Sequence, residues 1–152
     1  MRFKPAFLLI PLAMLGSGAI AQRRLPVIIP LHRTPVQQVA QPIDVLRADF
    51  AAQSGGTTAY FMSGSAQLGP QARTLLAAQA AWLRRHPEVV VRIEGHGDSA
   101  DTRDHALAVG ARRAEEVRAY LVLLGVPAAQ LSAMSWGKER PGAPSAVTVL
   151  VR

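Results

Sequence analysis

The chain has 152 residues, no cysteine, a formal net charge of +7 and a hydrophobic content of 49%. This length corresponds to a single domain. Without cysteine there is no disulfide framework, no thiolate site and no residue to which a bacterial lipid anchor can be attached. Basic residues never run longer than two and are not interleaved with the Trp and Tyr residues, which argues against a nucleic-acid surface.

Residues 1–21 have the pattern of a cleavable signal peptide. Residues 1–4 are basic, residues 7–15 are apolar, and residues 19–21 form a small-x-small cleavage signal before Gln22. We therefore expect a secreted, periplasmic protein that begins at Gln22. An uncleaved membrane anchor is the alternative, because no charge lies between residues 5 and 22, but a proline and a Gly-Ser-Gly run interrupt that stretch.

Residues 22–56 are predicted to form a Pro-rich spacer with a short edge element. Three prolines interrupt residues 22–41, and no hydrophobic period is sustained there. Residues 42–52 carry a short apolar pattern that ends at Ser54-Gly55-Gly56. This pattern fits either a short helix or a strand on the edge of the domain.

Residues 57–152 are predicted to form the folded domain, with elements in the order βαβαββ. We expect strands over 57–61, 88–94, 131–136 and 146–151, on the basis of β-branched and apolar residues bounded by turn residues. Apolar residues at helical spacing predict one helix from Pro70 to His86-Pro87 and another from an N-cap at Asp101 or Thr102 to Gly125. The predicted fold class is α+β, a two-layer α/β sandwich with two helices packed on one face of a small mixed sheet.

The most informative motif is Gly95-His96-Gly97-Asp98 at a strand end, followed by Arg112-Arg113-Ala114 on the next helix. Helical side chains lean toward the N-terminus, so we expect Arg113 to reach back toward the strand-end loop. A carboxylate for an ammonium group and a guanidinium for a carboxylate together suit a small zwitterion. The alternative from these residues alone is a surface ion pair between Asp98 and Arg113.

Three blocks of this chain resemble the OmpA-like domain family over about residues 49–152. They are Ile93-Glu94-Gly95-His96-Gly97-Asp98, Gly110-Ala111-Arg112-Arg113-Ala114 and Ser135-Trp136-Gly137-Lys138-Glu139-Arg140-Pro141. The resemblance implies a non-enzymatic module that binds peptidoglycan non-covalently through the diaminopimelate of the stem peptide. It implies a site made of Asp98, Arg113, Gly97 and Ala106, with no cofactor, no metal and no nucleic acid. It also implies a Gram-negative cell envelope, in the periplasm or in association with the outer membrane.

The sequence also contains residues that could suggest other functions. Ser135 and Lys138 match the Ser-x-x-Lys spacing of acyl-enzyme hydrolases, but they leave a strand instead of opening a helix. His96, Asp98, Asp101 and His105 have no familiar metal-ligand spacing. The stretch between Pro141 and the last strand is short for the family. An OmpA-like domain that interacts with an envelope protein and has lost wall binding therefore remains an alternative.

Overall fold

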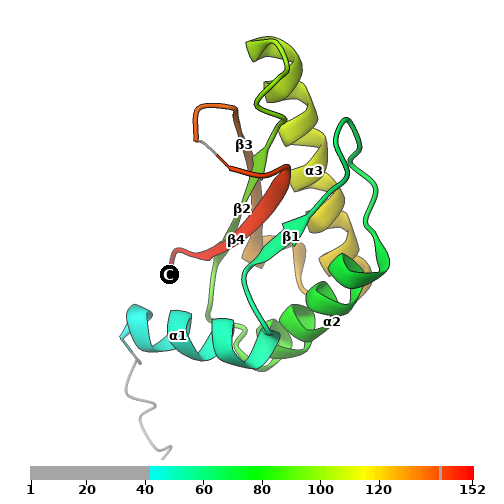
Figure 1. Ribbon diagram of the computed structural model, residues 1–152. Helices are drawn as coiled ribbons and strands as arrows, with labels where there is room; N and C mark the ends of the chain where they lie inside the picture. Colours follow the sequence, from blue (N-terminus) through cyan, green and yellow to red (C-terminus); the bar gives the residue numbers. More distant parts are fainter. Residues whose placement is uncertain (1–41, 141) are drawn as a thin grey trace, which may run out of the picture. The chain divides into compact units, whose positions relative to one another are not determined.

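The computed structural model describes residues 42–140 and 142–152 (Figure 1). The predicted signal peptide, its cleavage site and the Pro-rich stretch up to residue 41 lie outside the described residues. None of the helices in the described part is long and apolar enough to cross a membrane. The elements are α1 (Ile43–Ser54), β1 (Thr58–Tyr60), α2 (Pro70–Arg85), β2 (Val91–His96), α3 (Arg103–Leu123), a 3-10 turn (Ala128–Gln130), β3 (Leu131–Gly137) and β4 (Ser145–Leu150).

The four strands form a mixed sheet in the order β1-β4-β2-β3. β2 and β3, which α3 connects, are parallel, and β4 inserts antiparallel between β1 and β2. Strands joined through a helix usually run parallel, whereas a strand reached through a loop is free to run the other way. The predicted α+β class and βαβαββ order of the domain are confirmed.

Helices α2 and α3 cover one face of the sheet (Figure 1). Along β2, Val91 and Ile93 are fully buried toward these helices, while Arg92 and Glu94 alternate to the other face. The apolar core lies between the two layers and includes, among others, Leu76, Leu83, Val117, Leu121 and Leu150.

The ends of the helices follow local sequence signals. Pro70 opens α2, where its fixed φ suits the first turn. The Thr102 side chain accepts a hydrogen bond from the His105 amide and caps α3, so the second of the two predicted N-caps is the one used. β2 starts three residues later than predicted, because Val89 donates to the His86 carbonyl in a turn after α2.

Residues 43–54, for which the sequence left two alternatives, form a helix. Phe50 is fully buried on this helix, and its ring meets Trp82 of α2 edge to face with centroids 5.1 Å apart. The Trp82 indole also donates to Asp49 at 2.7 Å. The predicted boundary at residue 57 groups this helix with the spacer, whereas the structure packs it into the same core as the sheet.

Candidate functional site

Asp98 and Arg113 come from adjacent elements and form an ion pair. Asp98 lies just past the end of β2, and Arg113 lies at the middle of α3. The Arg113 Nη1 and Asp98 Oδ1 atoms are 3.0 Å apart. Both side chains are buried, so the pair is not the exposed surface ion pair that the sequence left open. The expected reach of Arg113 back toward the strand-end loop is confirmed.

The Arg113 guanidinium is 0% exposed and binds two chain segments, the loop after β1 and the end of β2. Its Nε donates to the Ser65 carbonyl at 2.8 Å, and its Nη2 donates to the Met62 carbonyl at 3.1 Å. Its Nη1 donates to the His96 carbonyl at 2.7 Å, and the guanidinium lies 5.5 Å from the centre of the Phe61 ring. A buried cation needs such partners to offset its lost hydration.

Asp98 is 7% exposed and is held from its other side by the loop after β1. Its Oδ2 accepts the Ser63 hydroxyl at 2.8 Å and the Gly64 amide at 2.6 Å. Burial by itself would raise the pKa of Asp98, but the Ser63 and Gly64 hydrogen bonds and the Arg113 charge together lower that pKa below its usual value. Asp98 is therefore an anion at neutral pH.

Gly97 and Ala106, the other two predicted site residues, contribute a close backbone approach. A Cβ added to Gly97 would lie 2.6 Å from the Ala106 Cα, so only glycine fits at position 97. Ala106 is itself fully buried. The two residues hold the Asp98 loop against the first turns of α3. The structure thus brings all four predicted residues together.

The loop of residues 62–65 is the part of the site that the sequence did not reveal. Residues 63 and 64 form a turn. The contacts of the loop with Asp98 and Arg113 join residues 34 to 51 positions apart, and most of them use backbone atoms. Only the Ser63 hydroxyl is a side-chain signal.

The end of β3 and the loop that follows it support the site. The Gly97 amide donates to the Gly137 carbonyl at 2.8 Å. Further along this loop, Arg140 stacks on Trp136 at 4.0 Å and pairs with the buried Glu94 carboxylate at 2.6 Å. Burial, and to a smaller extent the Arg140 charge, lowers the pKa of the neighbouring His96. The Glu94 charge acts in the opposite direction. The imidazole is therefore neutral at neutral pH.

The residues that would form an acyl-enzyme site or a metal site have other partners. The Ser135 hydroxyl donates to the Leu107 carbonyl at 2.8 Å, and the Lys138 amine donates to the Asp101 carbonyl. Neither group is positioned to activate the other. His105 Nδ1, in the first turn of α3, lies 2.8 Å from the carboxylate of the half-buried Asp101, which precedes the helix. Within residues 42–140 and 142–152, no group of three or more His, Asp or Glu side chains is placed to hold a metal ion.

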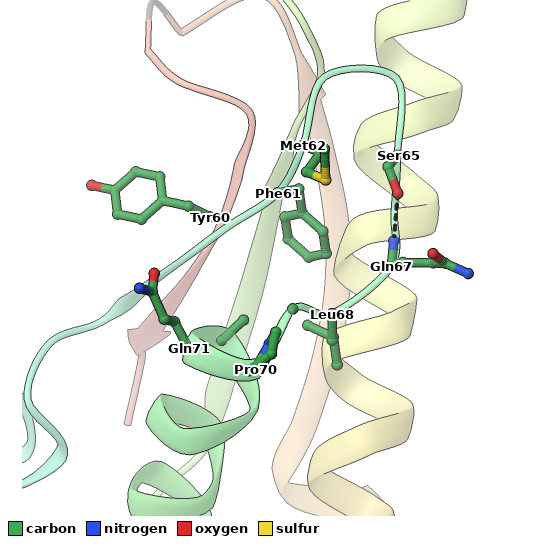
Figure 2. Close-up of a pocket in the computed structure, with 10 residues that line it drawn as sticks. Tyr60, Phe61, Met62, Ser65, Gln67, Leu68, Pro70 and Gln71 are labelled. Atoms are coloured by element: carbon green, nitrogen blue, oxygen red, sulfur yellow. Dashed lines mark hydrogen bonds between the residues drawn. The ribbon is translucent and has the colours of Figure 1, made fainter.

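A groove lies beside the 62–65 loop, between the end of β1 and the first turn of α2. Figure 2 shows its lining, which is made of apolar and uncharged polar residues: Tyr60, Phe61, Met62, Ser65, Gln67, Leu68, Gly69, Pro70, Gln71 and Ala72. Recognition of a zwitterion requires opposite charges. The groove lining has none, so the Asp98–Arg113 pair is the better candidate site.

Two named relatives are similar to this chain. A peptidoglycan-associated lipoprotein of Agrobacterium fabrum is 41% identical over 86 residues, which cover 57% of this chain and 49% of the relative. A peptidoglycan-associated lipoprotein of Pseudomonas aeruginosa is 45% identical over 99 residues, covering 65% of this chain and 58% of the relative. The chain thus matches about half the length of these relatives.

Solved structures give the same result. The peptidoglycan-associated lipoprotein of Burkholderia pseudomallei superposes with a TM-score of 0.61 at 35% identity, covering 64% of this chain and 92% of that one. The C-terminal domain of Helicobacter pylori MotB, at 20% identity and a TM-score of 0.57, covers 62% of this chain and 84% of that one and shares the fold. Residues 60–149 match the model of the OmpA family, and the chain belongs to that family.

Proposed function

We propose that the protein is a non-catalytic peptidoglycan-binding module of the bacterial cell envelope, which grips the diaminopimelate of the stem peptide non-covalently. The observation that carries the proposal is the Asp98–Arg113 pair, with a carboxylate and a guanidinium 3.0 Å apart where three chain segments meet. The names of the similar lipoproteins support a wall ligand.

The chemistry of the pair matches an amino-acid head group. Diaminopimelate ends in an ammonium and a carboxylate on one carbon. Asp98, held as an anion, accepts from the ammonium, and the Arg113 fork donates to the carboxylate. Gly97 and Ala106 act through the backbone, because their close contact fixes the position of Asp98 relative to α3.

The proposed location is the periplasm, reached through a signal peptide at residues 1–21. Because the sequence has no cysteine, we propose a product without a lipid anchor, in contrast to relatives that are named lipoproteins. Association with the outer membrane and contact with an envelope protein are further parts of this proposal.

Co-sedimentation of the purified protein with peptidoglycan tests the proposal. Peptidoglycan with diaminopimelate stems should pellet the protein, and peptidoglycan with lysine stems should not, because lysine lacks the carboxylate of the zwitterionic head. Asp98→Asn should lose binding by at least about tenfold, since it removes a charged partner. The matched control is Asp101→Asn, a carboxylate in the same loop that lies outside the pair.

Arg113→Lys provides a second arm, with the exposed neighbour Arg112→Lys as its control. Arg113→Lys should weaken binding because an ammonium cannot form the bidentate fork. Equal pelleting of Asp98→Asn and the unmodified protein contradicts the site. A folded protein that never pellets with diaminopimelate-type peptidoglycan contradicts wall binding. That result favours the alternative, an OmpA-like domain that interacts with an envelope protein.

A further inference from the structure

We infer that residues 62–65 act as an internal ligand of the Asp98–Arg113 pair, which a diaminopimelate head must displace in order to bind. The inference rests on the proposed function and concerns the regulation of its site. Ser63 and Gly64 then determine affinity through the closed form of the loop, although neither belongs to the predicted site.

The polarity of the loop matches that of an amino-acid head. Toward Asp98 the loop presents two donors, the Ser63 hydroxyl and the Gly64 amide. Toward Arg113 it presents two acceptors, the carbonyls of Met62 and Ser65. A zwitterion would offer donors from its ammonium to Asp98 and acceptors from its carboxylate to Arg113. The loop therefore occupies the positions of the expected ligand atoms.

The loop also blocks access to the Asp98–Arg113 pair. Arg113 is 0% exposed and Asp98 is 7% exposed while these contacts are made. A ligand outside the loop cannot approach the guanidinium to hydrogen-bond distance, because the Met62 and Ser65 carbonyls lie there at 3.1 and 2.8 Å. Direct binding of a carboxylate by Arg113 thus requires the loop to leave.

The loop is held chiefly by the contacts that a ligand would replace. The Met62 side chain is 80% exposed and points away from the core, and Ser63 and Gly64 are also exposed. Gly64 has a φ of +68°, and a Cβ built on it would meet no atom within 4 Å. Such a tip buries little apolar surface, so its opening is not opposed by lost packing.

Gly64→Ala tests the inference without a steric clash. The substitution disfavours the left-handed backbone of the closed loop, and Gly55→Ala is a matched control. Gly55 has a φ of +75° and no atom within 4 Å of a built Cβ, and it lies at the end of α1, away from the site. Because the open form becomes more populated, Gly64→Ala should bind a soluble diaminopimelate peptide about threefold to tenfold more tightly. Gly55→Ala should leave the Kd unchanged.

Ser63→Ala is the second variant, because it removes one donor to Asp98 and leaves the backbone free to close. It should also tighten binding of the peptide. If the loop instead belongs to the binding surface, both substitutions weaken binding, and that result overturns the inference.

Hydrogen exchange of the Gly64 amide separates this inference from the proposed function. The internal-ligand role predicts that this amide exchanges through local opening, well ahead of the Ile93 amide in β2. Exchange of both amides only through global unfolding overturns the inference, even if the peptide binds. If no variant binds the peptide, the proposed function fails, and the exchange rates still decide whether the loop opens.

Discussion

Gly95 on β2 and Gly110 on α3 lie backbone against backbone. A Cβ added to Gly95 would lie 2.8 Å from the Gly110 carbonyl carbon, and one added to Gly110 would lie 2.9 Å from the Gly95 oxygen. Asp98 follows Gly95 by three residues, and Arg113 follows Gly110 by the same number. The glycine contact therefore sets the spacing of the two elements that carry the ion pair.

The first prediction is that Gly95→Ala separates α3 from β2. The added methyl group meets backbone, which cannot rotate away, so the free energy of unfolding should fall by about 3 kcal/mol. Urea denaturation measures this loss. Binding to peptidoglycan should weaken in the fraction that remains folded, because Asp98 and Arg113 move apart.

Gly69→Ala is the control for Gly95→Ala. Gly69 precedes α2 with a φ of −72°, and a Cβ there meets no atom within 4 Å. The free energy of unfolding of Gly69→Ala should differ from that of the unmodified protein by less than about 0.5 kcal/mol. A comparable loss in both variants would show that the glycine contact is not the cause.

The sequence predicts the fold well because its signals are local. Hydrophobic spacing, Pro70 at a helix start and a threonine cap at position 102 each act within one or two turns of chain. The helix at 43–54 could not be assigned, since a few apolar residues fit both periods. Contact of Phe50 with Trp82, more than thirty residues away, is part of what stabilises it as a helix.

The site divides in the same way. The meeting of Asp98 with Arg113 could be predicted, because a strand end and the helix that follows it are close in sequence and in space. The contact of residues 62–65 with these two side chains could not be predicted. Residues 62–65 lie 48 and 51 positions before Arg113 where they contact it, and they meet Arg113 through carbonyl groups that every residue type possesses.

The second prediction concerns the buried partners of Arg113. Arg113→Met leaves the Asp98 carboxylate buried without its cation and removes one donor from each of three carbonyls. The free energy of unfolding should fall by about 3–5 kcal/mol. Combining Arg113→Met with Asp98→Asn should cost less than the sum of the two single losses, because the unpaired charge is then gone. Denaturation of the four proteins gives this coupling.

Arg112→Met is the control for the charge itself. Arg112 is exposed on the same helix, and its loss should change stability by less than about 0.5 kcal/mol. Strict additivity of Asp98→Asn and Arg113→Met would contradict a direct interaction between the two side chains.

The third prediction is a pH dependence that originates at Asp98. Its pKa is raised by burial but lowered further by Ser63, Gly64 and Arg113, so the folded value lies below the unfolded value of about 3.9. The stability it contributes is complete above about pH 3.9 and is lost as the pH falls through the folded pKa. Between about pH 5 and pH 2, Asp98→Asn should therefore lose less unfolding free energy than the unmodified protein.

The loss of unfolding free energy in Ser63→Ala should lie between the losses in these two proteins, because the substitution removes one of the hydrogen bonds that lower the pKa of Asp98. Equilibrium denaturation at a series of pH values gives the three curves. Parallel curves for Asp98→Asn and the unmodified protein would mean that Asp98 has the same pKa in the folded and unfolded states.

The fourth prediction concerns the loop after β3, which Glu94 ties to the sheet. Glu94 is 3% exposed, and its two oxygens pair with Arg92 at 2.7 Å and with Arg140 at 2.6 Å. Glu94→Gln weakens both interactions and should lower the free energy of unfolding by about 2 kcal/mol. Arg140→Ala leaves the carboxylate paired with Arg92 and should cost about 1 kcal/mol. Equal losses in urea denaturation would instead assign the contribution of Arg140 to its stacking on Trp136.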